Sequence, residues 1–255
     1  MKTAIYTCIK DEQDYLEDWI RYHLDLGVDT LFIFEDIDSA SHKEICDKYP
    51  NVILKPILDL FDSEEKPLVI KMKEERKYRQ SMYAKRGIMW IKNTNPDIDW
   101  CFSLDCDEFI SSPVPFNSIL ERYNDIDAIL IRWHNYNASG HIFKPIYDKP
   151  IWKIYTQRCD YLKSDERSKH YTKICFNMRR LKEKYIWGVH TALSKNTIVV
   201  DDMWLNHYTT KSFEEFCDKL YKRGMFCNGY RKIDNFFELN PDIKIDDCNI
   251  LFSQT

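Results

Sequence analysis

Glycine is scarce in this 255-residue sequence, and long apolar runs are absent from it. Only six glycines occur, and none belongs to a glycine-rich loop of the kind that cradles phosphates. No apolar stretch approaches the roughly 18 residues that a helix needs to cross a bilayer. The 37 basic and 41 acidic residues are interleaved and leave a net charge of −4, so no basic track is predicted that would bind a nucleic acid.

The nine cysteines are odd in number and include no C-x-x-C pair. Both facts argue against a disulfide framework and against a zinc site, so we expect reduced thiols in a cytoplasmic protein. The residues from Met1 to Tyr6 begin directly as a strand, and we expect neither a secretion signal nor a transmembrane segment. Peripheral contact with a membrane stays open.

The first half of the sequence alternates apolar runs with helical patterns, which is typical of an α/β protein. Strands are predicted at Thr3–Ile9, Leu31–Phe34 and Val52–Leu54, with helices over residues 15–24 and 43–49 between them. This is a βαβαβ unit. It predicts a Rossmann-like, mostly parallel central sheet flanked by helices, with a nucleotide beyond the carboxyl ends of its strands.

An acidic cluster follows the next predicted strand. A long helix is expected over residues 74–94, then a buried strand at Trp100–Leu104, then Asp105-Cys106-Asp107-Glu108. Two carboxylates in a D-x-D pattern are suitable ligands for a hard divalent cation, Mn²⁺ or Mg²⁺, that accompanies a diphosphate. The alternative is a solvated turn after a strand, but the buried strand before the motif favours a functional site.

The second half changes to strands and aromatic-rich loops. Strands are expected at 128–132, 151–155 and 171–178, and a helix at 213–223. We interpret this half as a C-terminal acceptor-binding portion. The predicted organisation is a single domain over 1–255, with a nucleotide-binding half over 1–110, an acceptor-binding half over 111–230 and a tail over 231–255.

Polar loops after the first two strands should open at the same edge of the sheet as Asp105. Carboxylates there can accept hydrogen bonds from a ribose or a uracil, although ordinary loop composition explains them equally well. Basic residues elsewhere could neutralise a diphosphate leaving group, although most lysines are merely solvated. The candidates for nucleotide binding are Lys10, Glu12, Asp36, Lys85, Arg86, Asp105, Lys211 and Arg223.

Histidines supply the other candidates. His207 could add an imidazole to the carboxylate ligands of a metal, Asp105 and Asp107, although a lone histidine is more often structural. A transfer with inversion needs a base near the acceptor hydroxyl. The candidates for this catalytic role are His141, Asp165, Glu166 and His190.

At these residues the chain resembles the family 92 glycosyltransferases and their bacterial family 2-like relatives. The order of the matching segments along the chain is more specific than any single motif. They are Cys8–Glu12, Tyr15–Trp19, Tyr22-His23, Gly27–Asp29, Phe34–Asp36, Ser103–Phe109, Ser139–His141, His207-Tyr208, Lys211-Ser212 and Glu214–Phe216 up to Arg223-Gly224.

The resemblance implies a GT-A fold, a UDP-sugar donor, Mn²⁺ or Mg²⁺, and transfer with inversion. By position, Asp105 would contact the donor ribose and the metal, Asp107 would be the main metal ligand and His207 would complete the metal site. Lys10, Glu12 and Asp36 would surround the nucleoside. The chain departs from the family in Asp11, where asparagine is usual, and in the loop Glu35–Asp38. Both departures bear on which nucleobase the sugar donor carries.

The sequence therefore predicts a metal-dependent hexosyltransferase that moves a sugar from a UDP-sugar to a glycan or glycolipid. The expected setting is synthesis of capsule or lipopolysaccharide, in the cytoplasm or at the inner face of a bacterial membrane. Two alternatives stay open. A nucleotidyltransferase acting on sugar phosphates would release pyrophosphate instead of UDP, and a non-catalytic glycan-binding protein would need neither metal nor nucleotide.

Overall fold

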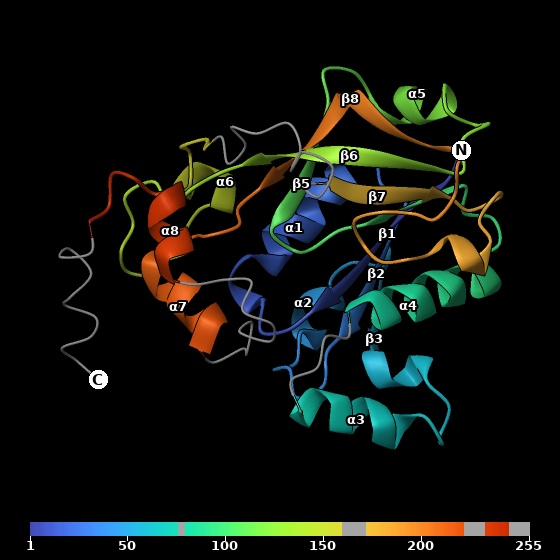
Figure 1. The fold of residues 1–255 in the computed structure, drawn as a ribbon, viewed down its shortest axis with the longest axis horizontal. Coiled ribbons are helices and arrows are strands. Elements are labelled where there is room, and N and C mark those ends of the chain that lie inside the picture. The colour runs from blue at the N-terminus through green and yellow to red at the C-terminus, as the bar shows by residue number, and fades with distance from the viewer. Residues whose placement is uncertain (76–79, 160–171, 222–232, 245–255) are drawn as a thin grey trace. The chain divides into compact units, whose positions relative to one another are not determined.

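An eight-stranded sheet organises the protein, which we describe from a computed structural model over residues 1–75, 80–159, 172–221 and 233–244 (Figure 1). The strand order is β3-β2-β1-β4-β7-β6-β8-β5. The strands are β1 Thr3–Ile9, β2 Thr30–Glu35, β3 Val52–Pro56, β4 Trp100–Ser103, β5 Glu108–Ser111, β6 Ala128–Asn135, β7 Thr172–Asn177 and β8 Thr197–His207.

The chain divides into two compact units, the first formed by residues 1–133 and 164–205 and the second by 134–163 and 206–255. Short 3-10 helices lie at Ile57–Leu60 and Glu183–Tyr185. The α-helices are α1 Gln13–Asp25, α2 Lys43–Cys46, α3 Lys66–Glu74, α4 Gln80–Thr94, α5 Phe116–Glu121, α6 Ile151–Ile154, α7 Phe213–Tyr221 and α8 Ile233–Leu239. None of the helices in the described residues is long and apolar enough to cross a membrane.

The sheet is mixed, and its parallel part positions the acidic loops. Strand β1 pairs in parallel with β2 and β4, and β2 pairs in parallel with β3. Strand β7 runs antiparallel to β4 and to β6. The loops that follow β1, β2 and β4 therefore open at one edge, and β7 begins at that same edge.

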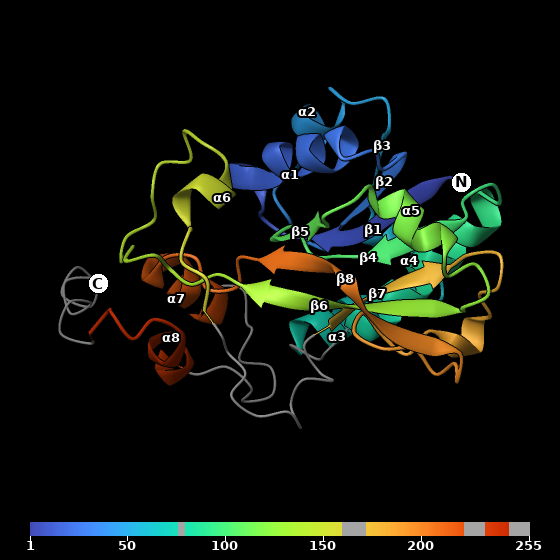
Figure 2. The same cartoon turned by 90° about the horizontal axis from the view of Figure 1, so that it is seen from above.

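Alternating side chains of the parallel strands pack on opposite helical layers. Tyr6 and Phe34 belong to the core cluster that includes Tyr83, Ile88 and Ile91 of α4. Figure 2 shows α1 and α2 on the other face of these strands. This two-sided burial explains why β1 and β2 read as almost continuous apolar runs in the sequence.

Two elements differ from the sequence-based expectation. The helix predicted over 74–94 is wrong at its start, because Glu74 belongs to α3 and α4 is described from Gln80. The strand predicted at 151–155 is also wrong. Residues Ile151–Ile154 form α6 after Pro150, and the buried side chains at both ends of this turn are three residues apart, which is a helical spacing.

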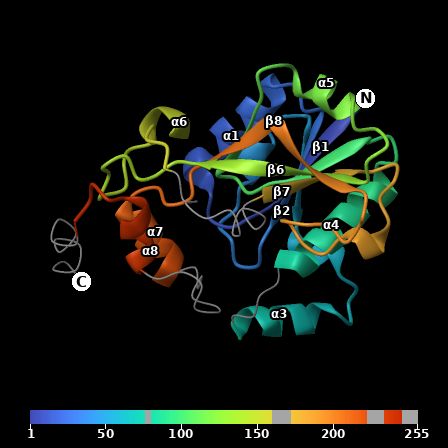
Figure 3. The same cartoon turned by 45° about the horizontal axis from the view of Figure 1, so that its top comes forward.

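The second unit has a small aromatic core of its own. Phe213, Phe216 and Leu220 lie on one face of α7 and form a buried cluster with Phe236 of α8. The rings of Phe213 and Phe236 are 4.9 Å apart between centroids, and α7 and α8 lie side by side (Figure 3). Their i, i+3, i+7 spacing is that of one face of an amphipathic helix, and α7 lies within the helix predicted over 213–223.

Gly87 allows β1 and α4 to approach closely. A Cβ atom at this position would lie 2.2 Å from Cε2 of Tyr6, whose ring is buried. We expect Gly87→Ala to lower the free energy of unfolding by about 1–2 kcal/mol, although alanine has the better helix propensity, because overpacking costs more than that preference contributes. Urea denaturation measures this loss.

The double variant Tyr6→Leu/Gly87→Ala tests the cause. Without the ring, the added methyl group should no longer destabilise, so the double variant should be at least as stable as Tyr6→Leu alone. A Gly87→Ala protein as stable as the wild type would contradict the close packing.

Candidate functional site

The D-x-D motif lies directly after β4 at the edge where the parallel strands end. The backbone N–H of Leu104 still donates to the carbonyl of Tyr6 in β1, and the chain then turns so that the N–H of Glu108 donates to the carbonyl of Asp105. Asp107 is 8% exposed and Glu108 is fully buried. The motif is thus a compact acidic turn in which Asp107 and Glu108 are buried and Asp105 is partly exposed.

A buried lysine from β7 reaches this turn. Ser103 of β4 is paired with Ile174 of β7, which puts Lys173 beside the start of the motif. The Lys173 ammonium lies 2.7 Å from Oδ2 of Asp105 and 3.6 Å from Oε2 of Glu108, and its side chain is completely buried. The lysine is therefore a built-in counter-ion for the acidic turn.

The charges of this cluster determine which carboxyl groups are ionised. Burial works to raise the pKa of Asp105, but the attraction of Lys173 outweighs it and holds that pKa below its usual value. Burial also raises the pKa of Glu108 well above the ordinary range, against the same attraction. Burial opposes the charge on Lys173, yet Asp105 and Glu108 raise the pKa of the lysine. Asp105 and Lys173 therefore form the ion pair, and Glu108 favours its protonated form.

His190 belongs to the same part of the first unit. Its Nδ1 lies 2.8 Å from the carbonyl of Thr172, which accepts only if Nδ1 carries the proton, so the lone pair is at Nε2. The hydroxyl of Thr172 donates to the His190 carbonyl in return. When the His190 ring is protonated, its positive charge is close enough to Asp105 to help lower the pKa of that carboxyl.

Helix α1 holds the strand that follows the motif. The Trp19 indole donates to the carbonyl of Glu108 at 2.9 Å, and the Tyr22 hydroxyl donates to the carbonyl of Ile110 at 2.7 Å. Nε2 of His23 accepts from the N–H of Ile110 at 3.4 Å. Burial lowers the pKa of His23 to about 3, so this imidazole is a neutral support for β5.

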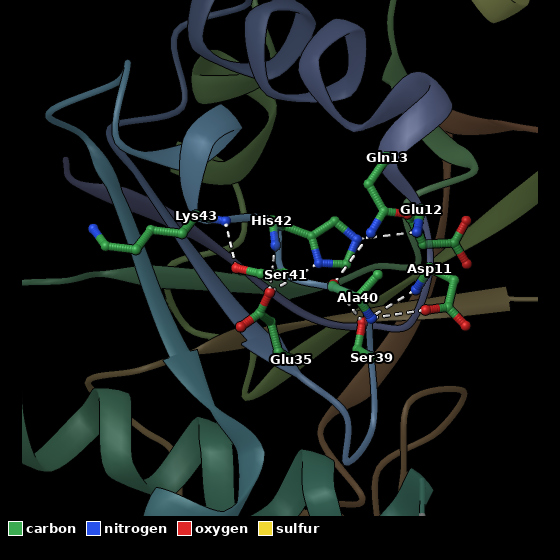
Figure 4. A network of polar contacts seen from close by, with 9 residues as sticks. All are labelled: Asp11, Glu12, Gln13, Glu35, Ser39, Ala40, Ser41, His42 and Lys43. Atoms are coloured by element: carbon green, nitrogen blue, oxygen red, sulfur yellow. Dashed lines mark hydrogen bonds and ion pairs between the residues drawn. The ribbon is translucent and has the colours of Figure 1, made fainter.

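The loops after β1 and β2 are joined through His42 (Figure 4). Its Nε2 accepts from the N–H of Glu12 at 3.0 Å, and its Nδ1 lies 3.0 Å from Oε1 of Glu35. Asp11, in a left-handed conformation with φ 54°, accepts from the N–H of Ala40. The His42 ring and the Asp11 carboxylate thus connect the two loops, and Glu35 orients the His42 ring.

Of the predicted nucleoside contacts, Glu12 is close enough to the motif to act on it electrostatically. It is the N-cap residue of α1, and its charge helps burial to raise the pKa of Cys106, the middle residue of the motif. Asp36 directly follows β2, and its Oδ1 accepts from the Tyr83 hydroxyl of α4 at 3.2 Å. Lys10 directly follows β1. All three belong to the edge that carries Asp105.

Two predicted diphosphate contacts are engaged by other carboxylates. Lys85 lies 3.0 Å from Glu183 and Arg86 is paired with Glu65, and both basic side chains are nearly half exposed on α4. Their role in binding a diphosphate stays a prediction.

In the second unit, His207 ends β8 and is 5% exposed. Its Nδ1 lies 3.0 Å from Oδ1 of Asn135, which leaves the lone pair at Nε2. A metal-binding imidazole is usually oriented in this way by an oxygen at its other nitrogen. The tautomer therefore fits a metal ligand, and that role for His207 stays a prediction.

Lys211 precedes a capping box at the start of α7. It is buried in a left-handed conformation with φ 54°. Ser212 accepts from the N–H of Glu215, whose carboxylate accepts from the N–H of Ser212. The same carboxylate accepts from the hydroxyls of Tyr147 and Tyr155 at 2.5 and 2.7 Å. Burial works to raise the pKa of Glu215, but Lys211 and these hydroxyl groups lower it.

His141 lies in a turn that docks on the same helix. Its N–H donates to the carbonyl of Ala138, after Gly140 with φ 82°. Its carbonyl accepts from the N–H of Phe213, and its ring meets that of Tyr155 edge-on at 5.5 Å between centroids. Asp165, Glu166 and Arg223 lie outside the described residues.

The structure also identifies residues that the sequence did not. The sequence placed Lys173 only within a predicted strand and gave no role to His42. A buried lysine within the apolar run Tyr171–Met178 was the available signal for Lys173, because a charge in such a run needs a partner. Among the described residues, no group of three or more His, Cys, Asp or Glu side chains is arranged to hold a metal ion.

Comparisons with known proteins give no family. No family model and no curated protein matches the chain. The crystal structure of a mycobacterial protein is 13% identical with a TM-score of 0.35, and the match covers 55% of this chain and 43% of that one. A synthase from Anaerococcus prevotii, 4-diphosphocytidyl-2C-methyl-D-erythritol synthase, is 12% identical with a TM-score of 0.39 over 87% of this chain and 96% of that chain.

Stability should depend on pH through His23. Its pKa is about 3 in the folded protein against 6.5 for an ordinary histidine, so the unfolded chain takes up a proton first. The stability present above pH 6.5 is lost as the pH falls toward 3, by up to about 1.4 kcal/mol per pH unit. His23→Gln should show a shallower loss in urea denaturation over this window. An unchanged slope would mean that His23 does not titrate as described.

Removing the counter-ion should destabilise the acidic turn. We expect Lys173→Met to lower the free energy of unfolding by about 2–3 kcal/mol at pH 7, less than for a fully buried pair because Asp105 is partly exposed. The low pKa of Asp105 means that the contribution of the pair is present at neutral pH and is lost in acid, so the difference should shrink as the pH falls below 4. Lys195→Met, at an exposed lysine, is the control and should match the wild type.

Proposed function

We propose that this chain is a glycosyltransferase that moves a sugar from a UDP-sugar to a hydroxyl group of a glycan or glycolipid. The observation that carries the proposal is the acidic turn Asp105–Glu108 at the edge where four parallel strands end, with Lys173 and His190 beside it. This edge is where open α/β sheets bind nucleotides. The resemblance to family 92 glycosyltransferases supplies the reaction type.

The carboxylates of the turn are the proposed ligands of a divalent cation. Mg²⁺ beside a nucleotide is usually held by one or two carboxylates, with phosphate oxygens and water completing its shell. Asp107 is the proposed principal ligand, because Asp105 is already held by Lys173. A bound Mn²⁺ or Mg²⁺ would offset the charge that develops on the departing diphosphate.

Residues on the neighbouring loops would hold the nucleoside. Asp36 is oriented by the Tyr83 hydroxyl, and Glu12 is fixed through its backbone by His42. The carboxylates of these two residues can accept hydrogen bonds from the ribose hydroxyls or from the imide N–H of uracil. Lys10 adds a positive charge at the same edge.

His190 is the proposed general base. Nε2 of His190 takes the proton of the acceptor hydroxyl while the acceptor oxygen bonds to the anomeric carbon of the donor. The bond from that carbon to the phosphate oxygen breaks, and its electron pair leaves with UDP. The Thr172 carbonyl at Nδ1 orients the ring and stabilises the imidazolium that forms.

Release of UDP tests the proposal. UDP-glucose, UDP-galactose and their N-acetyl forms would be incubated with the protein and Mn²⁺, with and without glycan acceptors. We expect UDP release from at least one donor and a loss of about 100-fold or more in Asp107→Asn, because that carboxylate stabilises charge in the transition state. UDP with Mn²⁺ should also raise the Tm of the wild type and not of the variant.

Asp47→Asn is the matched control, because this aspartate is exposed and paired with Lys43 in α2. It should release UDP at the wild-type rate. Asp107→Asn with wild-type activity would refute the assigned ligand. Release of pyrophosphate, or binding of glycan with no response to UDP and Mn²⁺, would replace the proposed activity with one of the two alternatives.

A further inference from the structure

A hairpin of the first unit presents large apolar side chains to solvent. Residues 185–193, here called the 185–193 hairpin, turn back on themselves through an antiparallel bridge between Ile186 and Ala192. Trp187 is 63% exposed and Leu193 is 58% exposed. Tryptophan is rarely so exposed in a folded protein, so these two residues need an explanation.

The hairpin is firmly attached on its inner side. Ile186 is buried and Ala192 packs against the same core cluster. A Cβ atom at Gly188 would lie only 3.1 Å from the Ser81 hydroxyl of α4, so the backbone is tightly seated there. His190 is bonded to Thr172. The outer face is therefore held in place.

Alternation along the two arms places one set of side chains outward. Because Ile186 and Ala192 point to the core, their neighbours Trp187 and Leu193 lie on the opposite face, whereas Tyr185 packs partly against the core cluster. The ammonium groups of Lys182 and Lys184 each lie 5.8 Å from the centre of the Tyr185 ring. The outer face thus combines aromatic, aliphatic and cationic groups.

The charge around the hairpin is opposite to that of the whole chain. The chain has a net charge of −4, whereas Lys182, Lys184 and Lys195 are all exposed at or near the hairpin. The carboxylate of this segment, Glu183, is paired with Lys85. In the described part of the chain these three lysines have no carboxylate partner, so their charge faces solvent.

We propose that the 185–193 hairpin docks on the surface of an anionic lipid bilayer. Trp187 and Leu193 would enter the interface between headgroups and acyl chains, and the lysines would contact the anionic headgroups. A glycan-binding surface would offer carboxylate or amide groups to the sugar hydroxyls. Here the carboxylate of Glu183 is already paired with Lys85, so the hairpin fits a lipid surface better. Docking would bring His190, which belongs to the hairpin, toward acceptors that are carried by lipids.

Sedimentation with vesicles tests this surface without donor, metal or acceptor. The full chain should sediment with vesicles that contain phosphatidylglycerol and not with vesicles of phosphatidylcholine alone. Trp187→Ala/Leu193→Ser should bind about tenfold or more weakly, since each large apolar group contributes by leaving water. Lys182→Gln and Lys184→Gln should each weaken binding about fivefold.

Leu68→Ser is the matched control, because Leu68 of α3 is 62% exposed but lies outside the hairpin. It should bind like the wild type. The indole emission should shift to the blue with these vesicles, and Trp187→Phe should lose that shift. Thermal melts would establish that each variant is folded.

Three results would overturn the inference. They are a wild-type chain that does not sediment with phosphatidylglycerol vesicles, a Trp187→Ala/Leu193→Ser variant that binds as well as Leu68→Ser, and a Trp187-dependent shift that appears with soluble dextran and not with vesicles. None of these results depends on UDP release. A failure of the proposed enzyme activity would therefore leave this inference standing, and the reverse also holds.

Discussion

The ion pair between Lys173 and Asp105 is the interaction on which the candidate site depends. Four parallel strands end at one edge, and three of them, β1, β2 and β4, are each followed by acidic residues, which repel one another. Lys173 enters this edge from an antiparallel strand and is fully buried there. Its charge keeps Asp105 ionised beside Asp107, while Glu108 favours the neutral form. The turn can therefore present the Asp107 carboxylate while Lys173 offsets the charge of Asp105.

Several residues that resemble the glycosyltransferase family support the acidic turn through hydrogen bonds to the backbone of the next strand. Trp19, Tyr22 and His23 bond to the backbone of β5, directly after the acidic residues. His42 joins the loops after β1 and β2 in a similar way. In the second unit, Glu215 combines a helix cap with two tyrosine hydroxyl groups. These polar residues therefore form hydrogen bonds that support the residues proposed to bind the substrate.

Local patterns were sufficient where burial is regular. The apolar run Thr3–Ile9 is β1 at the predicted bounds, because burial on both faces leaves a continuous apolar signal. The pattern was misleading at Ile151–Ile154, where two isoleucines in a short apolar run fit a strand and a single helical turn equally well. It also failed at Glu74, which was predicted to begin the helix over 74–94 but is the last residue of α3.

The sequence by itself determined that acidic residues would gather at the carboxyl ends of neighbouring strands, because that follows from helix and strand periodicity within short segments. Only the tertiary structure decided which groups join them. Lys173 is 68 residues from Asp105, and its place follows from the antiparallel pairing of β7 with β4. His190 reaches the same edge through a hairpin seated on α4 and β7. Such pairings depend on which surfaces are buried together, and no local spacing in the sequence records them.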